Sequence, residues 1–185
     1  MRGILPQRRT QTLHAGRESI PGARYFVTFA TIKREPWLQS TFAIKAMLTA
    51  LLAWHDENDG LLLAGCVMPD HVHMLFRLGP QLNVGRCVAR WKSQVRRACG
   101  YTGGWQRDFW EHRIRPDEEF EAYGLYLFLN PYRAGLINAD QSWSGWICPE
   151  PAQFRFSNAL HEGGIPPKEW LDWPEERFEN LKVGG

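Results

Sequence analysis

Two histidines separated by one residue, His71 and His73, carry the side chains in this sequence that are best suited to hold a metal ion. The apolar stretches around them, residues 61–68 and 74–76, are typical of buried strands on either side of a turn at 69–70. Side chains two apart in a strand point to the same face, roughly 6.6 Å apart along the backbone. Both imidazoles are therefore placed to converge on one divalent ion.

A tyrosine on a predicted helix supplies a second chemical group. Residues 117–130 are expected to form this helix and to end it before Pro131, because proline cannot continue the hydrogen bonding of a helix. Tyr126 and Asn130 are four apart, so their side chains share one helical face, about 5–6 Å apart at Cβ. A nucleophilic hydroxyl beside an amide ligand is useful next to a metal ion, although a lone tyrosine on such a helix more often serves in packing.

Seven predicted elements position these groups. Their order is β-α-β-β-α-β-α, and the first six match the split β-α-β arrangement of a ferredoxin-like fold. We therefore expect an α+β protein with an antiparallel sheet, two helices on one face and the histidines on a central strand. The tyrosine-bearing helix follows. The strands are expected at 25–32, 61–68, 71–78 and 109–115, and the helices at 40–55, 83–99 and 117–130.

Length and composition indicate one domain with an appended tail. The chain of 185 residues is 44% hydrophobic, which is enough for one sizeable core. We expect a domain over 1–140 that includes a basic N-terminal leader, and an irregular, acidic tail rich in Trp and Pro over 141–185. The spacing of the four cysteines predicts reduced thiols. The sequence shows neither a membrane span nor a secretory signal, so we expect a cytoplasmic protein without a membrane partner.

Positive charge is concentrated on the body of the chain, although the net charge is only +2. Such a concentration attracts phosphates by counterion release, but solvated surface residues explain the same pattern equally well. The basic residues that we expect to contact a DNA backbone lie on the predicted helix over 83–99: Arg90, Lys92, Arg96 and Arg97. Arg133, at the end of the tyrosine helix, is expected either to contact a phosphate or to interact with the helix dipole.

Three blocks of sequence carry a family resemblance. They are residues 68–75 (MPDHVHML), 109–115 (FWEHRIR) and 126–136 (YLFLNPYRAGL). Together they resemble the IS200-like transposases with one catalytic tyrosine, and more closely the REP-associated tyrosine transposases. The resemblance covers roughly 24–137 in the same order. The three blocks together are far more specific than any one of them, and they select Tyr126 over its neighbours Tyr123 and Tyr132.

The resemblance implies a fold, a site and a reaction. It implies a ferredoxin-like HUH catalytic domain in which His71 and His73 bind Mg²⁺ or Mn²⁺, Tyr126 is the nucleophile and Asn130 is a third ligand. It also implies an endonuclease and strand transferase that cleaves single-stranded DNA beside palindromic hairpins, leaving a 5′-phosphotyrosine and a free 3′-OH. Related enzymes act as monomers or as homodimers, so both states remain open for this chain.

Two other functions compete with this interpretation. One is a non-catalytic DNA-hairpin-binding regulatory protein that uses the same basic surface without chemistry. The other is an RNA-binding module, although the strands lack the aromatic signature of that class. The tail adds a separate question, because its acidic residues either cover a basic groove and restrain activity or simply pack against the body.

Overall fold

The computed structural model describes residues 18–56, 60–100, 103–178 and 181. The basic leader with Arg2, Arg8, Arg9 and Arg17 lies outside the described residues, as do positions 57–59 and 101–102 in two predicted turns and Glu179 in the tail. Within the described residues, no helix is long and apolar enough to cross a membrane.

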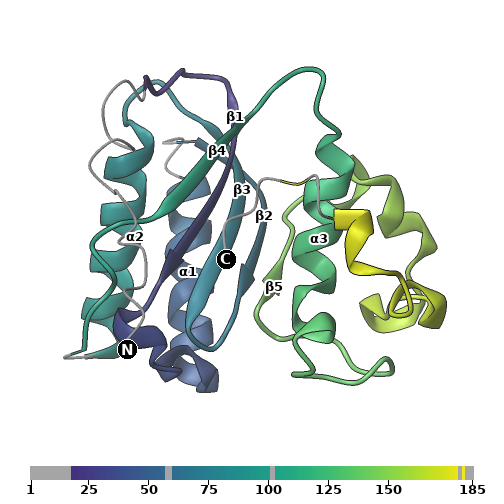
Figure 1. The fold of residues 1–185 in the computed structure, drawn as a ribbon. Helices are drawn as coiled ribbons and strands as arrows, with labels where there is room; N and C mark the ends of the chain where they lie inside the picture. Colours follow the sequence, from purple (N-terminus) through teal and green to yellow (C-terminus); the bar gives the residue numbers. More distant parts are fainter. Residues whose placement is uncertain (1–17, 57–59, 101–102, 179–180, 182–185) are drawn as a thin grey trace, which may run out of the picture.

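An antiparallel sheet of five strands forms the centre of the molecule, with the order β4-β1-β3-β2-β5 (Figure 1). The first four strands have the predicted ferredoxin-like order, and β3, which carries the histidines, is central. Aromatic and β-branched residues favour an extended chain in β1, and both faces of the sheet are buried. The strands are β1 (Arg24–Ala30), β2 (Gly60–Val67), β3 (His71–Leu78), β4 (Trp110–Ile114) and β5 (Trp146–Ile147).

Helices α1 (Thr41–Asp56) and α2 (Val84–Cys99) cover one face of the sheet, as predicted (Figure 1). The Asn83 side chain accepts a hydrogen bond from the Arg86 backbone N–H at 2.8 Å and so caps the start of α2. The apolar stripes of both helices meet the sheet in one core, where the large buried rings of Trp54 and Trp91 pack 5.1 Å apart.

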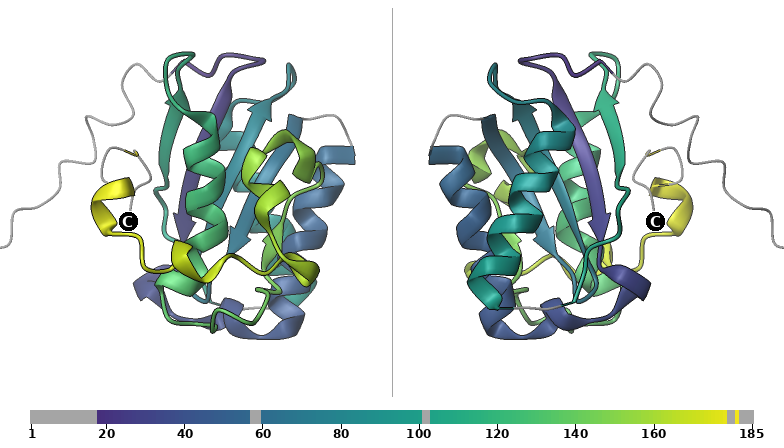
Figure 2. Two further views of the ribbon diagram at one scale, coloured as in Figure 1. Left: turned by 90° about the vertical axis from the view of Figure 1, so that its right-hand side faces the viewer. Right: turned by 90° about the vertical axis from the view of Figure 1, so that its left-hand side faces the viewer.

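The tyrosine-bearing helix α3 (Phe120–Arg133) covers the opposite face (Figures 1 and 2). Its predicted ends are wrong: it begins after residue 117 and continues past Pro131. The start is displaced because the Glu118 side chain accepts hydrogen bonds from the Arg115 backbone and from His112, which holds this segment in a turn. Pro131 is tolerated because it lies in the last turn, where one missing N–H costs only one hydrogen bond.

The tail packs on the outer side of α3 as a series of short 3-10 turns (Figure 2). Gly124 allows this approach, because a Cβ at that position would lie 2.3 Å from the Phe154 ring. Phe154, Phe156 and Phe178 are buried with α3 in a second core. The tail therefore belongs to the folded body, and the boundary at residue 140 stays a prediction. The 3-10 turns are η2 (Ile32–Arg34), η3 (Trp37–Gln39), η4 (Pro151–Gln153), η5 (Arg155–Ala159), η6 (Glu162–Gly164), η7 (Lys168–Trp170) and η8 (Glu175–Phe178).

Candidate active site

The two histidines meet at the start of β3, on the face of the sheet that α3 covers. In the β1–β3 register His71 lies opposite Ala30 and His73 lies opposite Thr28. The Nε2 atoms of the two rings are 3.0 Å apart, as the i, i+2 spacing in a strand predicts. His73 is only 2% exposed, whereas the His71 side chain is 16% exposed, so solvent reaches the pair from the His71 side.

The other ring nitrogen of each histidine has a partner of its own. The Asp70 carboxylate accepts a hydrogen bond from His71 Nδ1, and the Thr28 hydroxyl lies 2.8 Å from His73 Nδ1. The Arg34 guanidinium lies 3.5 Å from the other Asp70 oxygen. Partners of this kind fix the orientation and tautomer of imidazoles that bind metals.

Two ring nitrogens 3.0 Å apart need a hydrogen or a cation between them, because their lone pairs repel each other. With a hydrogen, His73 Nε2 donates to His71 and its Nδ1 accepts from Thr28. With a cation, both Nε2 atoms present lone pairs, and His73 Nδ1 donates to the Thr28 oxygen. The two Nε2 atoms are therefore close enough to bind one cation together.

Both imidazoles favour the neutral form that binds metals. Burial lowers the pKa of His73 well below its ordinary 6.5, and the charges of His71 and Arg34 lower it further. Burial also lowers the pKa of His71, although the hydrogen bond and charge of Asp70 oppose this shift. The pair therefore presents lone pairs at neutral pH.

The structure brings Tyr126 to the histidine pair. Its half-buried ring lies 5.8 Å from the His73 ring, centroid to centroid, and packs edge-on against it. The neighbouring tyrosines of α3 are placed differently. Tyr123 is buried between Phe26 and other core rings, and the Tyr132 hydroxyl donates to a backbone carbonyl at 2.6 Å. Burial raises the pKa of Tyr132 to about 12. This geometry favours Tyr126 as the nucleophile among the three.

A guanidinium lies against the Tyr126 ring. The Arg133 carbon Cζ is 5.3 Å from the centre of that ring and 4.5 Å from the centre of the Phe178 ring. Phe178, at the end of η8, also packs against Tyr126 at 5.9 Å. Arg133 therefore supplies positive charge next to the candidate nucleophile, and the tail contributes one wall of the site.

Asn130 lies on α3 one turn beyond Tyr126 and is half-buried. Its role as a third ligand stays a prediction. Among the described residues, no group of three or more His, Cys, Asp or Glu is arranged to hold a metal ion. A site built on His71 and His73 therefore depends on an amide, phosphate or water oxygen to complete its coordination.

The predicted basic cluster lies on the other side of the sheet. Arg90, Arg96 and Arg97 belong to α2, so the sheet separates them from the histidine pair (Figure 1). The Lys92 ammonium donates a hydrogen bond to the Gln106 carbonyl at 2.8 Å. DNA contact by these residues stays a prediction, and it concerns a surface away from the histidines.

Sequence reasoning missed the residues that hold the histidines in place. Asp70 directly precedes the pair, so the sequence alone places a carboxylate next to an imidazole and could have indicated this contact. Thr28 is 45 residues away along the chain and reaches His73 only through the β1–β3 register. No local pattern in the sequence indicates that register. His112, which was assigned no role, contacts both Glu118 oxygens at 2.8 Å and stacks with Tyr123.

Comparison with known proteins agrees with the fold. The family model for IS200-like transposases matches residues 19–113, about half of the chain. The REP-associated tyrosine transposase of Escherichia coli (strain K12) is 28% identical over 127 residues, or 67% of this chain and 75% of the relative. A solved structure of a REP-associated tyrosine transposase bound to a REP hairpin has a TM-score of 0.65 at 23% identity, covering 91% of this chain and 94% of that chain.

A ferredoxin-like sheet with a histidine pair facing a helix-borne tyrosine is the arrangement that the sequence resemblance implied, and the solved structure shares the fold. The chain belongs to the IS200-like transposase family. Its similarity to REP-associated tyrosine transposases confirms the closer resemblance. The matched residues 19–113 include both histidines, whereas Tyr126 follows them, so the structure is the observation that joins the tyrosine to the pair.

Proposed function

We propose that this protein is a metal-dependent, single-stranded DNA transposase or endonuclease that cleaves and rejoins DNA beside palindromic repeat hairpins through Tyr126. The observation that carries this proposal is the contact between the Tyr126 and His73 rings within one chain. Family membership supports a DNA-processing enzyme. The similar protein that was solved with a REP hairpin supports a hairpin as the substrate feature.

His71 and His73 would hold the ion through their Nε2 atoms, with Asn130 as the candidate third ligand. The 3.0 Å separation of these nitrogens allows both to bind one ion, and Mg²⁺ or Mn²⁺ is the proposed choice. Such an ion, when bound, polarises a non-bridging phosphate oxygen and offsets the negative charge of the transition state. Asp70 and Thr28 keep the two imidazoles in place.

Tyr126 carries the covalent step. Its hydroxyl oxygen attacks the phosphorus, the bond from phosphorus to the 3′ oxygen breaks, and the proton lost by the phenol is balanced by protonation of the leaving 3′ oxygen. The products are a 5′-phosphotyrosine and a 3′-OH. A phenol ordinarily has a pKa near 10, so positive charge close to the ring favours attack, and Arg133 supplies that charge. A 3′-OH then attacks the phosphotyrosine and releases the tyrosine. The original 3′-OH restores the strand, whereas the 3′-OH of another strand joins that strand instead.

A covalent adduct between protein and DNA tests the proposal. Wild-type protein and the Tyr126→Phe variant are incubated with hairpin-bearing single-stranded DNA and Mg²⁺ or Mn²⁺, and the adduct is resolved on a denaturing gel. We expect an adduct that requires the metal in the wild type and disappears in the variant. An adduct that persists in Tyr126→Phe would exclude this tyrosine as the nucleophile.

Tyr123→Phe is the matched control, because it removes a hydroxyl from the same helix one turn earlier. The Tyr123 hydroxyl contacts Glu118 at 3.4 Å, which is a long hydrogen bond, and we expect this variant to fold and form the adduct. A wild-type protein that binds the hairpin tightly, without an adduct and without sensitivity to His71→Ala, would instead support the non-catalytic regulatory protein.

The proposed site is complete within one chain, since β3 and α3 of the same molecule supply the histidines and the tyrosine. This geometry supports action by a monomer, and a homodimer with two separate sites is compatible with it.

A further inference from the structure

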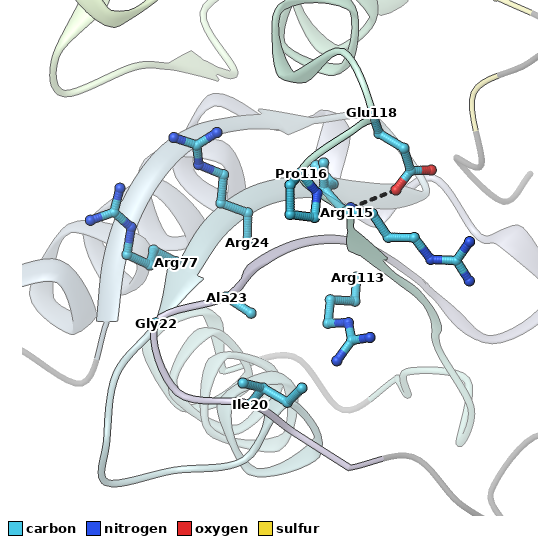
Figure 3. A pocket seen from close by; sticks show the side chains of 10 residues that line it. Ile20, Gly22, Ala23, Arg24, Arg77, Arg113, Arg115, Pro116 and Glu118 are labelled. Atoms are coloured by element: carbon cyan, nitrogen blue, oxygen red, sulfur yellow. Dashed lines mark hydrogen bonds between the residues drawn. The ribbon is translucent and has the colours of Figure 1, made fainter.

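A pocket of about 500 Å³ lies at the end of the sheet away from the histidine pair. In β3 the histidines lie at the start, whereas Arg77 is next to the last residue, and Arg77 pairs directly with Arg24 at the start of β1. Arg113 on β4 and Arg115 just beyond it complete the set of guanidinium groups that line the pocket (Figure 3). Arg24 and Arg77 face the α3 side of the sheet, whereas Arg113, which pairs with Tyr25, faces the α1–α2 side. The arginines at this end of the sheet therefore lie on both of its faces.

The positive charge of this arginine pocket is poorly compensated by its own lining. Glu118 is the one acidic residue among the residues that line it. The Glu118 carboxylate already accepts hydrogen bonds from the Arg115 backbone N–H at 2.6 Å and from His112 Nε2 at 2.8 Å. Arg24 and Arg77 are directly opposed on neighbouring strands, an arrangement of like charges that destabilises a sheet. An anionic ligand would relieve this repulsion.

The directions of the side chains indicate the shape of the ligand. Figure 3 shows Arg24 and Arg77 extending side by side, whereas Arg113 and Arg115 extend in other directions around the pocket. A compact anion needs guanidinium groups that converge on one point, but these groups are spread along a surface. Guanidinium groups bind phosphates through paired hydrogen bonds. The arrangement therefore suits a chain of phosphates better than a single one.

The pocket is connected to the candidate active site by two rigid elements. Arg77 and His73 are four residues apart on β3 and share a face, so they lie roughly 13 Å apart along the strand. The Arg24 guanidinium packs on the ring of Phe120 at the start of α3, at 4.3 Å, and Tyr126 follows six residues later, roughly 9 Å along that helix. A strand bound at the histidines is thus within reach of the pocket.

We propose that the arginine pocket binds successive backbone phosphates of the substrate DNA, on the part of the strand that leads away from the cleaved phosphate. This inference rests on the proposed function for its substrate. It adds a second, sequence-independent contact region, formed by Arg24, Arg77 and Arg115 at this end of the sheet and distinct from the predicted cluster on α2. The arginine contacts position the DNA and carry no information about its bases.

Salt-dependent binding tests the proposal without any chemistry. Fluorescence anisotropy follows a labelled hairpin with single-stranded flanks, bound to Tyr126→Phe protein without divalent metal, between about 0.05 and 0.2 M salt. Arg77→Gln and Arg115→Gln are introduced in this background, because both side chains are exposed and their loss should leave the fold intact. We expect roughly tenfold weaker binding for each and a salt slope shallower by about 0.7 to 0.9 per lost contact.

Lys45→Gln is the matched control. Lys45 is exposed on α1, across the sheet, and its loss changes the net charge equally. An equal loss of affinity in Lys45→Gln would show that only the total charge matters, and it would overturn the proposal that the arginine pocket binds phosphates. Unchanged affinity and slope in both arginine variants would overturn it as well, and adduct formation through Tyr126 would still stand.

A phosphate scan locates the contact on the DNA. Single phosphates of the hairpin and its flanks are replaced by neutral methylphosphonates, and each oligonucleotide is measured with the protein before and after Arg77→Gln. If Arg77 binds a particular phosphate, neutralising that phosphate should weaken binding before the substitution and have no further effect after it. Additive effects at every position would contradict a direct contact.

Discussion

At the scale of single residues, the histidine pair depends on two neighbours that perform no chemistry themselves. Asp70 and Thr28 engage the Nδ1 atoms, and both Nε2 atoms then face each other at 3.0 Å. Thr28 is the more informative of the two, because its hydroxyl can donate or accept. It can therefore support His73 in either tautomer, with or without an ion.

Replacing Thr28 by valine should weaken metal binding. Valine keeps the shape of the side chain but removes the oxygen that orients His73, and losses of such partners typically cost about 10- to 100-fold in metal affinity. Titration of Mn²⁺ by calorimetry measures the change. Thr28→Ser retains the hydroxyl and should bind nearly as well as the wild type, so equal losses in both variants would point to a packing defect instead.

Lys92 predicts a pH dependence of stability. Burial lowers its pKa from 10.5 to about 8, so the folded chain releases this proton more readily than the unfolded chain. Between these values the unfolded state binds more protons, and stability therefore rises as the pH increases from about 8 toward 10.5. Lys92→Met removes this contribution, so the stability of the variant should gain less than that of the wild type as the pH rises from about 8 toward 10.5.

Urea denaturation at neutral pH and at about pH 10 measures this difference. Lys45→Met on the surface of α1 serves as the control, because it makes the same substitution at an exposed lysine. The hydrogen bond from Lys92 to Gln106 is lost in Lys92→Met, which costs about 1 kcal/mol at either pH. If stability rises with pH by the same amount in the wild type and in Lys92→Met, Lys92 is not the source of the pH dependence.

At the scale of elements, periodicity predicted the existence and order of the first seven helices and strands, whereas the short strand β5 lies in the tail that was expected to be irregular. The bounds of β3 agree with the prediction at both ends, because a turn precedes it and Gly79-Pro80 follows. The ends of α3 were missed, since they depend on how Glu118 is used and on how far a helix tolerates Pro131. The β1–β3 register, and with it the Thr28 contact, is a tertiary property that no local pattern encodes.

The packing of the tail on α3 predicts an unusual response at Gly124. Alanine in a helix is normally favoured over glycine by about 1 kcal/mol. At this position the added Cβ would lie 2.3 Å from the Phe154 ring, and overpacking of this kind costs roughly 1–3 kcal/mol. Thermal and chemical unfolding should therefore show that Gly124→Ala is less stable than the wild type.

Gly85 in α2 provides the matched control. A Cβ there would meet its nearest neighbour at 3.5 Å, which is an ordinary contact. Gly85→Ala should be neutral or stabilising, whereas Gly124→Ala should recover part of its loss when Phe154 is also replaced by leucine. If alanine is stabilising at both glycines, the Phe154 ring does not pack closely enough against α3 to exclude a Cβ at position 124.

At the scale of the whole molecule, the tail completes a second core on the side of the sheet opposite α1 and α2. Phe154, Phe156 and Phe178 are buried in it. A salt bridge joins Arg155 of the tail to Glu119, the residue just before α3, at 3.7 Å. The tail supplies the cation in that pair. The observed packing supports a structural role over an acidic cover on a basic groove.

A chain that ends at residue 140 should therefore be less stable and less active. Removing the buried rings of the tail exposes the apolar side of α3, and several such rings contribute about 1.5–3 kcal/mol each when fully buried. Unfolding curves and adduct formation measure the two effects. Faster adduct formation at unchanged stability would instead favour the restraining role.

Helix α3 begins beside the arginine pocket and passes Tyr126 roughly 9 Å later. If both proposals hold, the length of this helix segment sets the distance along the DNA between the phosphate bound in the arginine pocket and the cleaved phosphate. The bases between these two phosphates do not set that distance. The choice of cleavage position would then depend on this fixed distance as well as on the features of the hairpin itself.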